Sequence, residues 1–195
     1  MDRNLTVSEL GGVHSTTVAP TSTAKTLQQT LLGEFVQTVL PALLIAAAMV
    51  IFVVQPTRVD GTSMEPTLHS GQRLVIEKVS YHFAAPDRGE VVVLKIPGRE
   101  EAALIKRVVA TAGDVIAIRN GRVYLNGAVL DEPYLSQFTP GDLPSTVVPD
   151  GYIFVLGDNR GASNDSRTFG MIPTDHLVGR AILSYWPPDA VGPVP

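Results

Sequence analysis

The chain has 195 residues, enough for one membrane anchor and one compact domain but not for two full soluble domains. It contains no cysteine, which excludes disulfides, thiolate zinc sites and a cysteine nucleophile. The formal net charge is -4 and the Lys and Arg residues are scattered, so we expect no nucleic-acid partner.

The N-terminal part of the chain divides into a polar tail and an apolar span. Residues 1–30 are rich in Ser and Thr and have no sustained apolar period, so we expect them to form a flexible tail. Residues 35–54 are almost wholly apolar, with Gln37 and Thr38 as the polar members. A helix over that span reaches about 30 Å, the thickness of a hydrocarbon core. We therefore assign residues 31–55 to a transmembrane helix.

A cleaved secretory signal is the alternative interpretation of this span. Such a signal has an apolar segment of about 7 to 15 residues that ends at a small-x-small cleavage site. Here the apolar run is longer, and Gln55, Pro56 and Thr57 follow it. These features favour an uncleaved, single-pass signal-anchor. The few positive charges on either side barely indicate its orientation, and we expect the tail inside and the body outside.

Short runs rich in β-branched residues follow the anchor and predict strands. They lie at residues 73–78, 90–96, 103–109, 115–119, 122–125, 128–130, 151–156 and 180–186. Asn-Gly pairs at Asn120 and Asn126 predict two tight hairpins and a three-strand meander. Residues 131–150 contain four prolines and predict a long surface loop. We therefore expect a β-rich domain over residues 56–187 and a C-terminal tail over residues 188–195.

Ser63 is the first candidate for chemistry. It lies nine residues beyond Val54, so an extended chain keeps it within about 30 Å of the membrane edge. Most serines in such a loop only form part of a turn, and a serine hydroxyl needs a neighbouring base to become a nucleophile. No histidine has an obvious carboxylate partner, so a Ser-His-Asp triad stays open but unsupported. The histidines are His14, His69, His82 and His176.

Lys106 is the alternative base. Strand alternation places it on the same face as Leu104 and Val108, which are core residues by pattern. To accept a proton near neutrality its pKa must fall from about 10.4 to about 7, and burial can cause such a shift. From periodicity alone, a Lys106 that reaches the surface or pairs with Glu100 or Glu101 is the favoured interpretation.

A polar cluster at residues 157–167 follows the strand that ends at Leu156. By composition it is an ordinary turn, because Asp and Asn hydrogen-bond to nearby backbone. It lacks the alternating acidic ligands of a calcium loop, so we expect no metal site there. Its dense donors and acceptors would also suit a role in fixing a catalytic side chain.

Four sequence blocks together resemble the type I signal peptidases, the bacterial leader peptidase family of membrane-anchored Ser/Lys endopeptidases. Each block alone is a weak signal, but all four occur in the family's order behind an apolar span. They are GTSMEPTL at 61–68, RGEVVV at 88–93, KRVVATAGD at 106–114 and GDNR at 157–160 with Ser163, Asp165 and Arg167.

The resemblance implies that Ser63 is the nucleophile and that Lys106, as a neutral amine, is the general base. It implies that Ser163 orients the lysine, while Asp158 and an ion pair of Asp165 with Arg167 support it. The Ser63 backbone N–H would form half of the oxyanion hole. Some members supply the other donor from a serine two positions earlier, where this chain has Gly61. That second donor therefore needs a substitute, such as water or a backbone group.

The resemblance also implies a fold and a substrate. The body would consist of coiled antiparallel β-sheets, and the substrate would bind as an added strand. Small pockets near Val59, Met64 and Ile105 would accept alanine-like residues before the cleavage site. The expected partners are signal peptides of preproteins, the lipid bilayer and the translocation machinery, without a cofactor. The expected location is the plasma membrane, with the catalytic domain on the extracytoplasmic face.

Two other functions remain as alternatives. A self-cleaving Ser/Lys repressor-type protease uses the same chemistry but is soluble, and the apolar span argues against it. A membrane-tethered binding module of the same fold without catalysis is the other, and the presence of both Ser63 and Lys106 argues against that.

Overall fold

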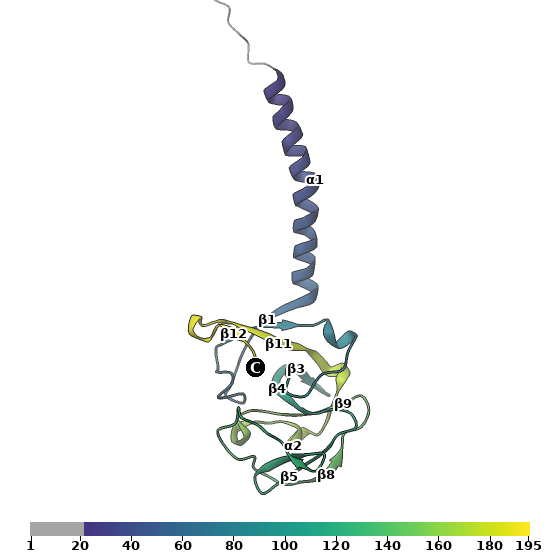
Figure 1. The fold of residues 1–195 in the computed structure, drawn as a ribbon, viewed down its shortest axis with the longest axis vertical. Helices are drawn as coiled ribbons and strands as arrows, with labels where there is room; N and C mark the ends of the chain where they lie inside the picture. The colour runs from purple at the N-terminus through teal and green to yellow at the C-terminus, as the bar shows by residue number, and fades with distance from the viewer. Residues whose placement is uncertain (1–21) are drawn as a thin grey trace, which may run out of the picture. The chain divides into compact units, whose positions relative to one another are not determined.

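The computed structural model describes residues 22–195, except for the side chains of residues 22–32, 49 and 99–102. The chain divides after Ala46 into two compact units, which are considered separately. Of the expected tail at residues 1–30, residues 1–21 lie outside the described residues, and residues 22–30 are helical. Figure 1 shows the helices and strands of both units.

Helix α1, Ser22–Val53, contains the apolar span. It begins earlier than expected, because residues 22–30 include Ala, Lys, Leu and Gln, which are good helix formers. Pro41 lies inside this helix and removes one N–H from the helical hydrogen-bond ladder. The segment Gly33–Val53 has a mean hydropathy of 2.4 and is long and apolar enough to cross a membrane. None of the residues described in its most apolar stretch is buried.

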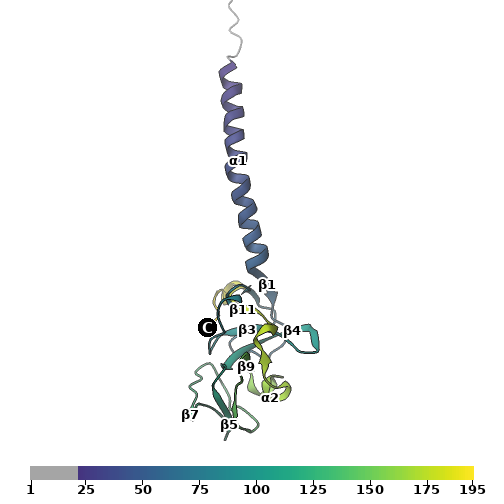
Figure 2. The same ribbon diagram turned by 90° about the vertical axis from the view of Figure 1, so that its right-hand side faces the viewer.

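The body consists of two antiparallel sheets, as predicted. The larger has the order β1-β2-β11-β3-β4-β9-β10, with β12 paired to β11, and the smaller has the order β7-β6-β5-β8. In Figures 1 and 2 the smaller sheet lies at the end of the body opposite β1 and β11. The strands are β1 Val54–Arg58, β2 Arg73–Glu77, β3 Val91–Ile96, β4 Arg99–Ala110, β5 Val115–Arg119, β6 Arg122–Leu125, β7 Ala128–Val129, β8 Leu143–Val147, β9 Tyr152–Leu156, β10 Ile172–Pro173, β11 Leu177–Trp186 and β12 Gly192–Pro193.

Residues 54–195 contain five short helices in addition to the strands. They are η1 Ser80–His82, η2 Arg160–Ala162, α2 Ser166–Phe169, η3 Thr174–His176 and η4 Pro188–Ala190. Helix η2 and the start of α2 lie in the polar cluster at residues 157–167. The backbone of this cluster therefore folds into compact turns rather than an open loop.

The meander of β5, β6 and β7 is confirmed, together with its two tight turns. Asn120 and Gly121 have φ values of 50° and 73°, and Asn126 and Gly127 have 53° and 86°. Positive φ at both central residues is typical of the type I′ turns that Asn-Gly pairs favour. The local sequence therefore determines this part of the smaller sheet.

Two expectations for irregular segments differ from the structure. Residues 131–150 do not form one continuous loop, because β8 pairs with β5 inside that range. Pro144 is tolerated there because β8 is an edge strand. Residues 188–195 do not form a free tail, because β12 pairs with β11. The β8 pairing is long-range, and β12 is a two-residue strand that contains a proline, so local sequence patterns indicated neither.

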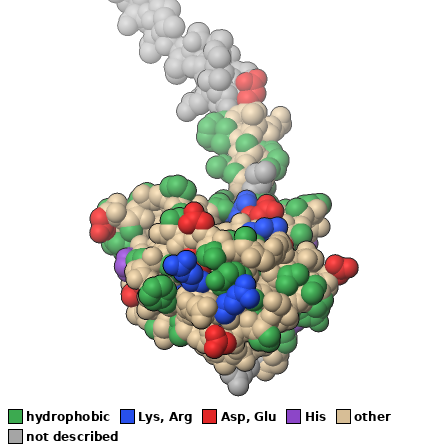
Figure 3. Space-filling model, turned by 60° about the horizontal axis from the view of Figure 1, so that its bottom comes forward, with side chains coloured by type: hydrophobic (Ala, Val, Ile, Leu, Met, Phe, Trp, Pro, Cys, Tyr) green, Lys and Arg blue, Asp and Glu red, His purple; other side chains and the backbone are tan. Residues whose placement is uncertain are grey.

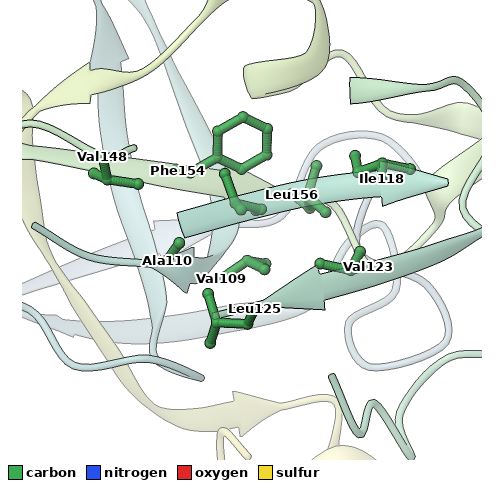
Figure 4. Close-up of a cluster of buried hydrophobic side chains, with 9 residues drawn as sticks. Val109, Ala110, Ile118, Val123, Leu125, Val148, Phe154 and Leu156 are labelled. Atoms are coloured by element: carbon green, nitrogen blue, oxygen red, sulfur yellow. The ribbon is translucent and has the colours of Figure 1, made fainter. Parts of the chain in front are cut away.

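Three clusters of buried apolar side chains form the core. The cluster in Figure 4 joins the two sheets and includes Val109, Ile118, Val123 and Phe154. A second cluster connects the Ser63 turn to β2 and β3, and a third lies between β3, β4 and β9. On the outer surface, Figure 3 shows basic, acidic and hydrophobic side chains interspersed on one face of the body. The second and third clusters meet at β3 and β4, and they position the site described next.

Candidate active site

Ser63 lies in a tight turn between β1 and β2. Glu65 N–H donates to Thr62 O at 3.2 Å, and Leu68 N–H donates to Met64 O at 2.9 Å. The side chains of Met64 and Leu68 are 1% and 2% exposed and anchor the turn in the second apolar cluster. The residue after Ser63 therefore points into the core, while Ser63 itself is only half-buried.

Lys106 lies on β4 and reaches Ser63. Its Nζ is 2.8 Å from Ser63 Oγ and also donates to Ile105 O at 2.8 Å. The side chain is 2% exposed, so the interpretation in which it extends to the surface is wrong. The pairing with Glu100 or Glu101 concerns side chains outside the described part of the chain.

Burial determines the protonation of Lys106. Loss of hydration lowers the pKa of its ammonium from 10.5 to about 8, although the charges of Asp165 and Asp158 act in the opposite direction. A neutral amine is therefore accessible at mildly alkaline pH. Among residues 22–195, no histidine hydrogen-bonds to Ser63, and His69 instead lies 3.7 Å from Glu65.

The start of the 157–167 cluster hydrogen-bonds to the backbone of the Ser63 turn. Asn159 N–H donates to Ser63 O at 3.0 Å, and its side-chain amide donates to Thr62 O at 3.0 Å. Gly157 packs so closely that a Cβ there would lie 2.5 Å from Ser63 O and would also collide with Ser163 Oγ. Sequence reasoning missed Asn159, which belongs to the GDNR block but has the composition of an ordinary turn residue.

Asp158 is fully buried and holds Arg107, the neighbour of Lys106 on β4. Arg107 donates to both carboxylate oxygens of Asp158, at 3.0 Å from Nε and 2.7 Å from Nη2. Thr67 Oγ1 donates to the same carboxylate at 2.6 Å and so connects the pair to the Ser63 turn. Sequence reasoning gave Arg107 no role. Strand alternation offers a signal for it, because two adjacent charged residues on a central strand cannot both face one side.

Asp165 and Arg167 form the expected ion pair, with Nε 2.8 Å from Oδ1. Asp165 also accepts from Gly157 N–H at 3.0 Å. Burial would raise the pKa of this carboxyl, but the Arg167 guanidinium and the Gly157 N–H outweigh it and lower the pKa below its usual value. Ser163 Oγ is buried and has no hydrogen-bond partner among the described residues. The ion pair therefore fixes the backbone at Gly157, directly behind Ser63.

A small pocket of about 90 Å³ opens beside Ser63 and Lys106. Its walls come from the chain before Ser63 and from β4, and they include the three expected residues Val59, Met64 and Ile105. Val59 and Met64 are buried and Ile105 is partly buried. The pocket is therefore adjacent to the serine, and its lining combines these apolar side chains with polar residues such as Arg58 and Asp60.

The backbone around Gly61 bears on the second oxyanion donor. Gly61 has φ of +89° and donates its N–H to Ser70 Oγ at 3.3 Å. No residue that the structure describes accepts a hydrogen bond from Ser63 N–H. The Ser63 N–H is therefore free for a ligand, whereas the Gly61 N–H already has an acceptor.

The fold and site together define a β-rich protein with an apolar N-terminal helix and a serine hydrogen-bonded to a buried lysine. The family described as signal peptidase, peptidase S26, matches residues 32–186. A probable signal peptidase I-1 of Synechocystis is 39% identical over 165 residues, covering 79% of this chain and 84% of that protein. Signal peptidase IB of Staphylococcus aureus is 37% identical over 154 residues, covering 70% and 80%. The chain therefore belongs to the signal peptidase family and is a type I signal peptidase.

A solved structure is also similar. The crystal structure of a signal peptidase I from Enterococcus faecalis matches with a TM-score of 0.45 and 29% identity, covering 50% of this chain and 97% of that one.

Proposed function

We propose that this enzyme cleaves signal peptides from preproteins with Ser63 as nucleophile and Lys106 as general base. The observation that carries the proposal is the 2.8 Å separation of Ser63 Oγ and Lys106 Nζ. A base at hydrogen-bond distance from a serine hydroxyl is the geometry that nucleophilic catalysis requires. The lowered pKa of Lys106, to about 8, supports the same role because only the neutral amine can accept the proton.

The reaction proceeds through an acyl-enzyme. Ser63 Oγ attacks the scissile carbonyl carbon while its proton moves to Lys106 Nζ. The resulting ammonium gives that proton to the leaving amine as the peptide C–N bond breaks. Lys106, neutral again, then takes a proton from a water molecule that attacks the ester carbonyl. This releases the signal peptide as a carboxylic acid and restores the Ser63 hydroxyl.

Four further residues hold the pair in place in this proposal. Ser163, with its unpartnered and buried hydroxyl, orients the Lys106 amine. Asp165 and Arg167 fix Gly157 behind Ser63, and Asp158 holds Arg107 beside Lys106. The Ser63 N–H stabilises the oxyanion. Since the Gly61 N–H is bonded to Ser70, a bound water is the proposed second donor.

The substrate binds as an extended strand between the segment before Ser63 and the β4 segment before Lys106. A pocket of about 90 Å³ lined by Val59, Met64 and Ile105 suits small side chains, such as alanine, next to the cut. Main-chain hydrogen bonds supply affinity and this pocket supplies selectivity. Both features fit the small-x-small rule of signal peptides.

The apolar helix anchors the enzyme once in the plasma membrane, with the body on the extracytoplasmic face. Support comes from the 21-residue apolar segment Gly33–Val53. An enzyme held there meets preproteins as they leave the translocation machinery, while their signal peptides are still in the bilayer.

The test uses the full chain in lipid vesicles with a preprotein substrate. Ser63→Ala and Lys106→Ala are each expected to abolish cleavage, and a serine-directed acylating inhibitor is expected to label wild type but not Ser63→Ala. A Val129→Ala variant, changed at an exposed site on β7, serves as the control. Wild-type cleavage by either active-site variant would refute the mechanism, and an unlabelled, inactive wild type would favour the silent binding module.

A further inference from the structure

The last residues of the described chain run along the sheet toward the candidate active site. We call residues 191–195 the C-terminal strap. Within it, Gly192 and Pro193 pair with Ser184 and Leu183 of β11. Val194 N–H donates to Ile182 O at 3.2 Å, which continues the same pairing by one residue. The strap is therefore an additional strand on β11.

The strap ends at Arg107, next to Lys106. Arg107 Nη1 donates to Pro195 O at 2.8 Å and to Gly89 O at 2.7 Å. Its other two nitrogens are taken by Asp158. The guanidinium is only 3% exposed, so its donors need protein acceptors in place of water. The Pro195 carbonyl thus completes the coordination of a buried charge, one residue from Lys106.

A second contact joins the strap to the apolar cluster beneath the Ser63 turn. The side chain of Val194 packs against the apolar cluster that contains Val59 and Met64. These two residues line the small pocket, and Met64 directly follows Ser63. One residue of the strap therefore packs on the cluster that also contains two pocket residues, and the next holds the neighbour of Lys106.

We propose that the C-terminal strap is a positioning element that keeps Ser63 and Lys106 in register, and this rests on the proposed Ser/Lys mechanism. Without the Pro195 carbonyl, Arg107 loses one of its acceptors. Asp158 and Gly89 O then remain as its acceptors, and Asp158 also accepts from Thr67 of the Ser63 turn. Small displacements of a catalytic pair cost rate steeply, about 10²-fold for about 1 Å.

The experiment compares two changes at the same place in the full chain in lipid vesicles. Deletion of residues 194 and 195 removes both contacts, whereas Pro195→Ala keeps the backbone carbonyl that Arg107 uses. We expect the deletion to lower kcat at least tenfold with KM within about twofold, and to move the pKa of the kcat/KM profile. Pro195→Ala should keep wild-type kcat.

Two further variants keep the inference testable if the deletion does not fold. Val194→Ala should lower kcat, whereas Val191→Ala, at a 58% exposed position of the same strap, should not. Ser63→Ala is measured in parallel. The deletion or Val194→Ala could retain full kcat and an unchanged pH profile while Ser63→Ala is inactive. That result would refute the positioning role of the strap and leave the Ser/Lys mechanism intact. Activity of Ser63→Ala would instead overturn the mechanism.

Discussion

At the scale of single residues, the site depends on one buried amine. Lys106 would be a costly side chain in the core if it were permanently charged, because removing an ammonium from water is unfavourable. The structure gives it a hydroxyl and a carbonyl as partners rather than a carboxylate in direct contact. Such partners suit the neutral form as well as the charged form. This arrangement allows the proton to leave Lys106 at a pH close to the working range.

The first prediction concerns the pH dependence of cleavage. With a pKa of about 8, the neutral fraction of Lys106 is about a tenth at pH 7 and about nine-tenths at pH 9. Since the proposed mechanism uses the neutral amine, kcat/KM should rise roughly tenfold between these values and then level off. Steady-state cleavage of a peptide substrate checks this. A profile that falls from pH 7 to 9 would contradict a lysine base.

The second prediction concerns the space behind Ser63. Gly157→Ala would place a methyl group 2.5 Å from Ser63 O, a contact that requires the backbone to move. We expect kcat to fall about 10²-fold, because the nucleophile shifts relative to Lys106. Gly161→Ala is the matched control, since its Cβ meets only the flexible Gln137 side chain, at 3.3 Å. Equal activity of the two variants would show that the Ser63 turn adapts freely.

The residues of the site were predictable to different degrees. Ser63 and Lys106 followed from sequence blocks, and the structure brings them to hydrogen-bond distance. Arg107 and Asn159 were missed because their importance lies in long-range contacts, to Asp158 and to the Ser63 turn. Local sequence patterns do not reveal which buried acid pairs with which buried base. From periodicity alone, a Lys106 that reaches the surface or pairs with a carboxylate was favoured. The reason is that a buried ammonium is costly unless it has a partner, and the sequence pattern did not show that Ser63 would be that partner.

At the scale of elements, local patterns predicted the strands with strong turn signals and missed β8 and β12, which both contain proline. The meander was clear because Asn-Gly pairs specify its turns. Strand β8 was hidden by its proline, and β12 consists of two residues that pair only because β11 lies beside them. An edge strand gains its stability from the sheet, so its own sequence needs few β-forming residues.

The third prediction tests the second turn of the meander. Gly127 has φ of +86° with open space around it, so Gly127→Ala introduces backbone strain without a steric clash. The cost should be about 1 kcal/mol of unfolding free energy, measurable by urea denaturation. Cleavage activity in the absence of urea should not change, because the turn lies in the smaller sheet. A loss of activity at unchanged stability would be the unexpected result.

At the scale of the whole molecule, Ser63 and Lys106 both lie in the unit that begins at Ala47, whereas most of the apolar helix lies in the other unit. The fourth prediction is that residues 47–195 alone cleave a short soluble peptide with kcat/KM within a few-fold of the full chain. The same fragment should process a vesicle-inserted preprotein much more slowly, because it no longer shares the membrane with its substrate. Parallel assays with both substrates check this. Equal loss on both would show that the helix also stabilises the catalytic body.

The position of β11 in the larger sheet has a consequence for how the enzyme matures. This strand is the last long element of the chain, yet it lies between β2 and β3, which precede it by about a hundred residues. Until β11 is made and inserted, the strands next to the Ser63 turn and those next to Lys106 have no sheet to join them. Pairings of such long sequence separation form slowly. We therefore expect cleavage activity to appear only after β11 has paired with both β2 and β3.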